Sequence, residues 1–136
     1  MMPPTIQPES FNPDLLHAAY GLLQRLGVTE NYKGFRYAAY AAALCVPCQD
    51  RLLLVTKCLY PDVADYFSTS WVCVERDLRT VIAVAWERNP VLLAAFTHCP
   101  ENYKPSCSQF IAALAYYLRS NDIDPLASAS PNLYSQ

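Results

Sequence analysis

Apolar side chains recur every three or four residues through much of the chain, which is the spacing of an amphipathic helix. Asn12 stands where a helix is capped, Pro13 follows at the first helical position, and Gly27 suits the left-handed turn that ends a helix. These positions predict a first helix over 13–26. Its apolar face consists of Leu15, Leu16, Ala19, Leu22, Leu23 and Leu26.

Caps and prolines divide the remaining pattern into further helices. Pro47 ends one helix, Pro61 starts another, Asn89-Pro90 repeats the cap-plus-proline start, and Ser106 with Gln109 forms a capping box. Hydroxyls at 68–70 separate a short helix from a long one. The helices predicted after the first are 33–44, 50–58, 62–67, 70–86, 91–96 and 106–119.

The pattern predicts an all-α fold, a compact bundle of six or seven helices. No segment alternates apolar and polar residues as a half-buried strand does, and three glycines supply few of the turns that a β fold needs. Residues 1–13 are expected to form a flexible lead-in, 14–119 the helical domain, and 120–136 a flexible tail rich in Ser, Pro, Asn and Asp.

The composition is that of one folded domain, with 53% hydrophobic and 16% charged residues in 136. No apolar run approaches the length that spans a bilayer, and the N-terminus lacks the basic and apolar regions of a signal peptide. We therefore expect a cytoplasmic protein with no membrane partner.

Six cysteines, at 45, 48, 58, 73, 99 and 107, are interpreted mostly as reduced core residues. Cys45 and Cys48 form a CxxC, but a structural zinc site needs four ligands. The remaining candidates, His98, Cys99 and Cys107, lack a second CxxC spacing. We expect no metal or other cofactor; a metal held by the CxxC is the alternative.

Catalytic machinery is not visible in the sequence. The two histidines, His17 and His98, fall in separate segments, and neither is paired with a recognisable nucleophile. We therefore expect neither enzymatic activity nor a small-molecule substrate.

Residues 61–86 have the outline of a helix-turn-helix, a short helix followed by a tight turn and a long helix. On the long helix, the predicted buried face holds Trp71, Val74, Leu78, Val81, Ile82 and Ala85. The opposite arc holds Val72, Glu75, Arg76, Arg79, Thr80 and Ala83. Two arginines on such an arc suit guanine in the major groove, while a solvated face with a Glu75–Arg79 ion pair is the alternative.

Net charge is −2, but its distribution is uneven. Glu9, Asp14, Asp122 and Asp124 lie outside the stretch 15–119, which therefore carries ten basic and eight acidic side chains, or +2. This balance permits DNA binding but lacks the dense basic patch of a strong phosphate binder.

Short motifs along 15–119 resemble the C-terminal DNA-binding effector domain of the stage-zero sporulation response regulator. In the centre they are Leu59-Tyr60-Pro61-Asp62-Val63-Ala64, Val74-Glu75-Arg76, Arg79 and Val84-Ala85-Trp86. On either side they are Leu26-Gly27-Val28, Lys33-Gly34-Phe35, Lys104-Pro105, Ser108, Phe110-Ile111-Ala112 and Leu118-Arg119.

The resemblance implies a transcription regulator whose 70–86 helix binds a short promoter box in double-stranded DNA, commonly as a dimer. In the family two arginines and a glutamate near the start of this helix face the bases, and Glu75 and Arg76 match the second and third of these. The family also carries a receiver domain; with about fourteen residues ahead of the first helix, we expect none here.

Several positions depart from the family pattern. Cys73 replaces the other arginine, and Val72 replaces the preceding serine. Asp65 and Tyr66 replace a basic pair before the turn, and Tyr117 replaces a lysine near the end of the last helix. Each lost arginine contact costs about 1–3 kcal/mol of base discrimination.

Two hypotheses follow. In the first, the long helix binds promoter DNA, with Arg76 and Arg79 as principal contacts and Glu75 contacting a base or orienting them; Val72, Cys73 and Thr80 share the surface. Its expected phosphate contacts are Lys33, Lys57 and Arg119. In the second, the chain is a protein interaction module with weak or no DNA binding, because Tyr66 and Trp71 flank the turn and Val72 lies on the exposed arc. That module pairs with itself or with a full-length regulator.

Overall fold

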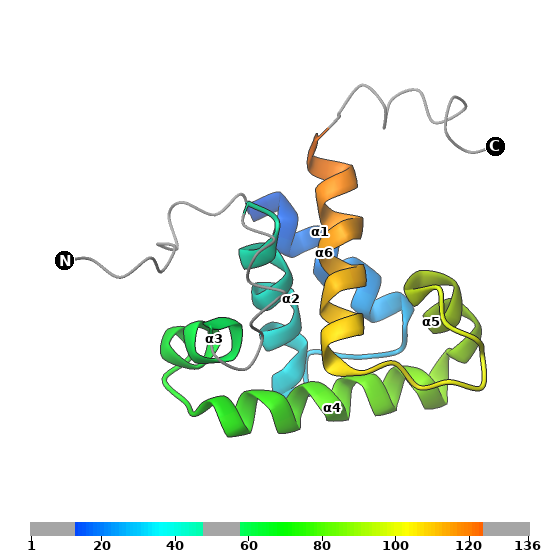
Figure 1. The fold of residues 1–136 in the computed structure, drawn as a ribbon, viewed down its shortest axis with the longest axis horizontal. Coiled ribbons are helices and arrows are strands. Elements are labelled where there is room, and N and C mark those ends of the chain that lie inside the picture. The colour runs from blue at the N-terminus through cyan, green and yellow to red at the C-terminus, as the bar shows by residue number, and fades with distance from the viewer. Residues whose placement is uncertain (1–12, 48–57, 124–136) are drawn as a thin grey trace.

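The computed structural model describes residues 13–47 and 58–123, and this part of the chain contains helices and no strand (Figure 1). The helices are α1 Pro13–Arg25, α2 Lys33–Cys45, α3 Tyr60–Tyr66, α4 Trp71–Arg88, α5 Pro90–Thr97 and α6 Cys107–Ile123. The all-α prediction is confirmed. The helix predicted over 50–58 lies outside the described residues except for Cys58.

The predicted caps are formed at the starts of three helices. The Ser70 hydroxyl accepts a hydrogen bond from the backbone N–H of Cys73 at 3.2 Å, which caps α4. The Asn89 side chain accepts from the N–H of Leu92 at 3.3 Å and caps α5. At the start of α6, Ser106 and Gln109 exchange bonds of 2.9 and 3.2 Å, so the capping box is confirmed.

Two helices run further than predicted, for different reasons. The end of α4 is tied to the turn after α1, because Arg88 donates to the carbonyl of Gly27 at 2.7 Å and the Asn89 amide donates to that of Arg25 at 2.9 Å. These hydrogen bonds join residues more than sixty positions apart, so the local pattern of apolar residues could not predict them. The end of α6, Ile123, stands two residues before Pro125, the next residue that cannot continue a helix.

The core is built around α2, which contacts α1, α3, α4 and α6. Every residue of α2 except Lys33 and Arg36 is buried, including the five alanines between 38 and 43. These small side chains let neighbouring helices approach the central helix closely. The predicted buried face of α4 is also confirmed at Val74, Leu78, Val81, Ile82 and Ala85.

Two predictions about burial are wrong. Trp71 is 42% exposed rather than buried, because it begins α4 ahead of the turns that pack on the other helices. The core interpretation of the cysteines holds for Cys45, while the others in the described part of the chain are only half-buried. Those four are Cys58, Cys73, Cys99 and Cys107.

Glycine at position 34 is required by the crossing of α2 and α4. A Cβ added to Gly34 would lie 2.5 Å from Cγ2 of Val81 and 2.8 Å from the carbonyl carbon of Asp77. The contact is with α4 backbone as well as with a side chain, so a rotamer change cannot relieve it.

We expect Gly34→Ala to lower the free energy of unfolding by about 1–3 kcal/mol or to force the two helices apart. Gly21→Ala is the matched control, because nothing lies within 4 Å of a Cβ at that helical position. It should raise stability by roughly 0.5–1 kcal/mol through helix propensity. Urea unfolding measures both, and equal effects of the two changes would contradict the close-approach interpretation.

Candidate nucleic-acid interface

The segment α3–turn–α4 has the helix-turn-helix outline that the sequence predicts. Leu59, Val63 and Ala64 are buried, and α3 packs directly on α4. In the turn, Ser68 adopts a left-handed conformation with φ of 56°, and the N–H of Thr69 donates to the carbonyl of Ala64 at 2.9 Å. The turn therefore closes on α3 before Ser70 caps α4.

The outward side of α4 is centred on Arg76. Successive helical residues are rotated by about 100°, so Arg76 points between Glu75 and Asp77 and away from Val74 and Leu78. Its side chain is 65% exposed. Of the other residues predicted for this surface, Val72, Arg79 and Thr80 are exposed, and Cys73 and Glu75 are half-buried.

Arg76 has two local partners on α4. Its Nε lies 3.5 Å from Oδ1 of Asp77, an ion pair whose exposed arginine limits its contribution to stability. Its backbone carbonyl accepts a hydrogen bond from the Thr80 hydroxyl at 3.2 Å. The Thr80 oxygen is therefore left mainly as an acceptor, while the terminal nitrogens of Arg76 remain available to a ligand.

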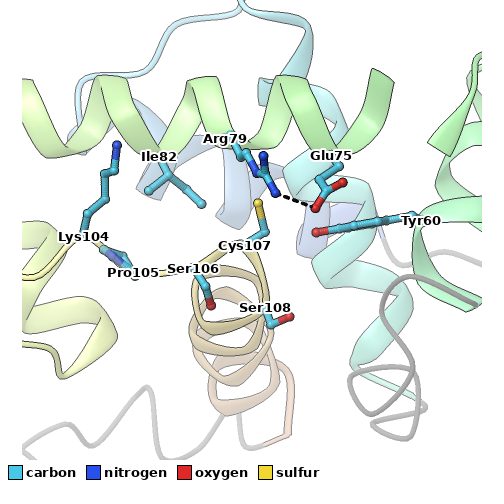
Figure 2. A pocket seen from close by; sticks show the side chains of 9 residues that line it. All are labelled: Tyr60, Glu75, Arg79, Ile82, Lys104, Pro105, Ser106, Cys107 and Ser108. Carbon is cyan, nitrogen blue, oxygen red and sulfur yellow. Dashed lines mark hydrogen bonds and ion pairs between the residues drawn. The ribbon is translucent and has the colours of Figure 1, made fainter. Parts of the chain in front are cut away.

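Glu75 and Arg79 form the ion pair that the sequence left as an alternative, with Nη2 of Arg79 3.0 Å from Oε2 of Glu75. Figure 2 shows both side chains directed into a cleft between α4 and the start of α6. The cleft holds about 330 Å³. Its other lining residues are Tyr60, Ile82, Lys104, Pro105, Ser106, Cys107 and Ser108. Arg79 lies only about 60° around the helix axis from Arg76, but its side chain turns into this cleft.

The phosphate contacts predicted from the sequence are not all brought to α4. Lys33 is the exposed first residue of α2, beside Gly34 where that helix meets α4. Arg119 lies in the last third of α6, which runs away from α4, and its guanidinium lies 5.6 Å from the Tyr116 ring centroid (Figure 1). Lys57 lies outside the described residues.

Sequence reasoning missed Lys104, Tyr60 and Cys107 as neighbours of the α4 surface. Lys104 and Cys107 belong to the segment after α5, and only the packing of α6 on α4 brings them beside Glu75 and Arg79. The Lys104-Pro105 pair was noted as a family motif, but nothing in its spacing indicates a place next to α4.

The thiols on the two sides of α4 differ in acidity. Hydrogen bonds from the Ser70 and Thr69 hydroxyls lower the pKa of Cys73, and Arg76 lowers it further. Burial raises the pKa of Cys107 despite its hydrogen bond with Tyr60. Burial is also the main reason that the pKa of the Tyr60 hydroxyl is raised, and the neighbouring Cys107 thiol raises it further. Neutral pH therefore favours a reactive thiolate at Cys73 over one at Cys107.

Within 13–47 and 58–123, no group of three His, Cys, Asp or Glu residues is placed to hold a metal ion. Cys45 of the CxxC is buried, and Cys48 lies outside the described residues. Among the described helices, none is long and apolar enough to cross a membrane.

We expect iodoacetamide to alkylate Cys73 severalfold faster than Cys107 in the folded protein at pH 7.5, because its thiolate is more populated and more exposed. As pH rises, the Cys73 rate should level off first, since its pKa is the lower of the two. Peptide mapping by mass spectrometry separates the sites. In urea the two rates should converge; equal rates in the folded state would contradict the assigned environments.

A comparison with protein families finds a match over most of the chain. The model described as "Sporulation initiation factor Spo0A C terminal" matches residues 19–118, which include every helix from the middle of α1 to most of α6. This family is the DNA-binding output domain of the sporulation regulator, a regulatory family and not an enzyme family. The chain belongs to the Spo0A C-terminal family.

Proposed function

We propose that this chain regulates transcription by binding double-stranded promoter DNA through α4. The observation that carries the proposal is Arg76, an exposed arginine at the centre of the outward face of α4, in a chain of this family. An α-helix fits the major groove, and arginine donates to both O6 and N7 of guanine. A chain that binds promoters acts in the cytoplasm. The resemblance to the family also favours binding as a dimer, with two copies on adjacent half-sites.

The neighbours of Arg76 take different roles in this proposal. Val72, 53% exposed on the same side, suits the methyl group of thymine. Thr80 offers its hydroxyl oxygen to a base amino group. Glu75 is held by Arg79, so it orients that arginine more than it contacts bases. Cys73 contributes only a thiol where the family has a second arginine.

Affinity should be modest and sensitive to salt. One arginine contact is missing at Cys73, and the described basic residues near α4 are few. Lys33 supports the surface from the start of α2 as a phosphate contact. Because Arg119 is in the last third of α6, which runs away from α4 (Figure 1), we expect it to contribute little to a duplex held by α4 of the same copy.

We expect Arg76→Ala to weaken binding to a duplex carrying the family's promoter box by about 5- to 150-fold, from the loss of one bidentate base contact of 1–3 kcal/mol. Binding to a shuffled duplex should change far less, so the preference between the two falls. Fluorescence anisotropy at about 50 mM salt measures both affinities.

Arg119→Ala is the matched control, because it removes the same charge from the far part of α6. Its affinity should stay within about twofold of the unmodified chain. No detectable binding by the unmodified chain at low salt, or an unchanged preference in Arg76→Ala, would overturn the proposal.

A second candidate function, protein–protein association, is favoured by the apolar surface at the turn. Tyr66, Trp71 and Val72 are 43%, 42% and 53% exposed, and they follow one another around the end of α3 and the start of α4. Exposed large apolar side chains close together in the chain favour a contact surface at the turn. The partner would be a second copy or a full-length regulator.

This alternative predicts a concentration-dependent dimer that Val72→Asp dissociates, because a carboxylate would lose hydration in the contact. Val91→Asp is the control, since Val91 is 61% exposed on α5, away from the turn. Light scattering over micromolar concentrations gives the mass of each variant. A strict monomer that binds the promoter duplex tightly would remove the alternative.

A further inference from the structure

The outward face of α4 is bordered by two different structures. On the Asp77 side lies the start of α2, where Gly34 meets the α4 backbone. On the Glu75 side lies the segment 104–108, which lines the cleft with Arg79 and Ile82. Arg76 is rotated by about 100° from both Glu75 and Asp77, so it lies midway between the two borders.

Lys104 is fixed at its backbone and free at its ammonium. It precedes the buried Pro105 and the capping residue Ser106, which together hold the start of α6. Its side chain is exposed and extends along the cleft towards α4 (Figure 2). Within the described part of the chain it forms no ion pair. An unpaired cation on an anchored backbone is suited to an anion brought to α4.

The charge of the cleft favours an anion as well. Its charged side chains are Arg79, Lys104 and Glu75, so they sum to +1. The carboxylate of Glu75 is already occupied by one nitrogen of Arg79, which leaves other guanidinium donors for a second acceptor. The exposed hydroxyls of Ser106 and Ser108 add two neutral donors at the same edge.

We infer that Lys104 and Arg79 hold a backbone phosphate of the bound duplex at this cleft, opposite the phosphate contacted by Lys33. The inference rests on the proposed function and deepens it. A helix about 10–12 Å wide fills a major groove of about 12 Å, so phosphates run along both borders of that helix. Lys33 is at one border and Lys104 is at the other. The cleft contacts the backbone and carries no base preference.

The test measures the salt dependence of binding to a shuffled duplex by anisotropy, from about 50 to 200 mM salt. Log K falls as log salt rises, and in Lys104→Ala this slope should be less steep by about 0.9, the value for one phosphate contact. The loss of affinity of Lys104→Ala relative to the unmodified chain should therefore become about 3.5-fold smaller between about 50 and 200 mM salt. Lys104→Arg should keep the slope, and Arg119→Ala, far along α6, should not change it.

The preference for the promoter box over the shuffled duplex should stay the same in Lys104→Ala, whereas Arg76→Ala lowers it. Because Lys104 is exposed, circular dichroism and urea unfolding should match those of the unmodified chain. A duplex-binding chain with an unchanged slope in Lys104→Ala would overturn the inference and leave the proposed function standing. A chain that binds neither duplex would overturn both.

Discussion

The contact between the backbone of α2 at Gly34 and the backbone of α4 at Asp77 is the constraint on which the interface depends. No side chain separates the two helices there, so their distance is set by main-chain atoms. Since α2 is buried on nearly all sides, it cannot move to accommodate a larger residue. The crossing therefore fixes the rotation of α4, which puts Val74 and Leu78 inside and Arg76 outside. It also puts the start of α2, with Lys33, beside that outward face.

The same rotation separates two arginines that the sequence places one turn apart. Arg79 falls on the side of α6 and pairs with Glu75, whereas Arg76 falls on the outward side. Both side chains are exposed, 71% at Arg79 and 65% at Arg76, and both have a carboxylate partner. The pair of Arg79 with Glu75 is the shorter, at 3.0 Å against 3.5 Å for Arg76 with Asp77, so Arg79 is held more closely by its own helix. Under the proposed function, we therefore expect base discrimination to depend more on Arg76 than on Arg79.

Local features were predictable from the sequence, and tertiary ones were not. Ser70, Asn89 and the Ser106–Gln109 box are caps whose hydrogen bonds join residues three apart, so the chain itself contains both partners. The buried face of α4 follows from periodicity in the same way. The prediction that Trp71 is buried was wrong because the apolar periodicity of α4 extends to its first residue, whereas the helices that pack on α4 do not cover that residue. The position of Lys104 beside α4 depends on α5 and α6 folding back, which no spacing encodes.

Three of the departures expected from the resemblance lie outside the core, whereas Tyr66 and Tyr117 pack against it. Val72 and Asp65 are exposed, Cys73 is half-buried, and none of them belongs to the buried cluster. Tyr66 stacks on Tyr40 with ring centroids 4.2 Å apart, so this exposed side chain of α3 also packs on α2. Stability and DNA contact are therefore separable on this scaffold. Because the crossing at Gly34 is independent of Val72 and Cys73, we expect substitutions at these two positions to change what α4 presents without changing where α4 lies.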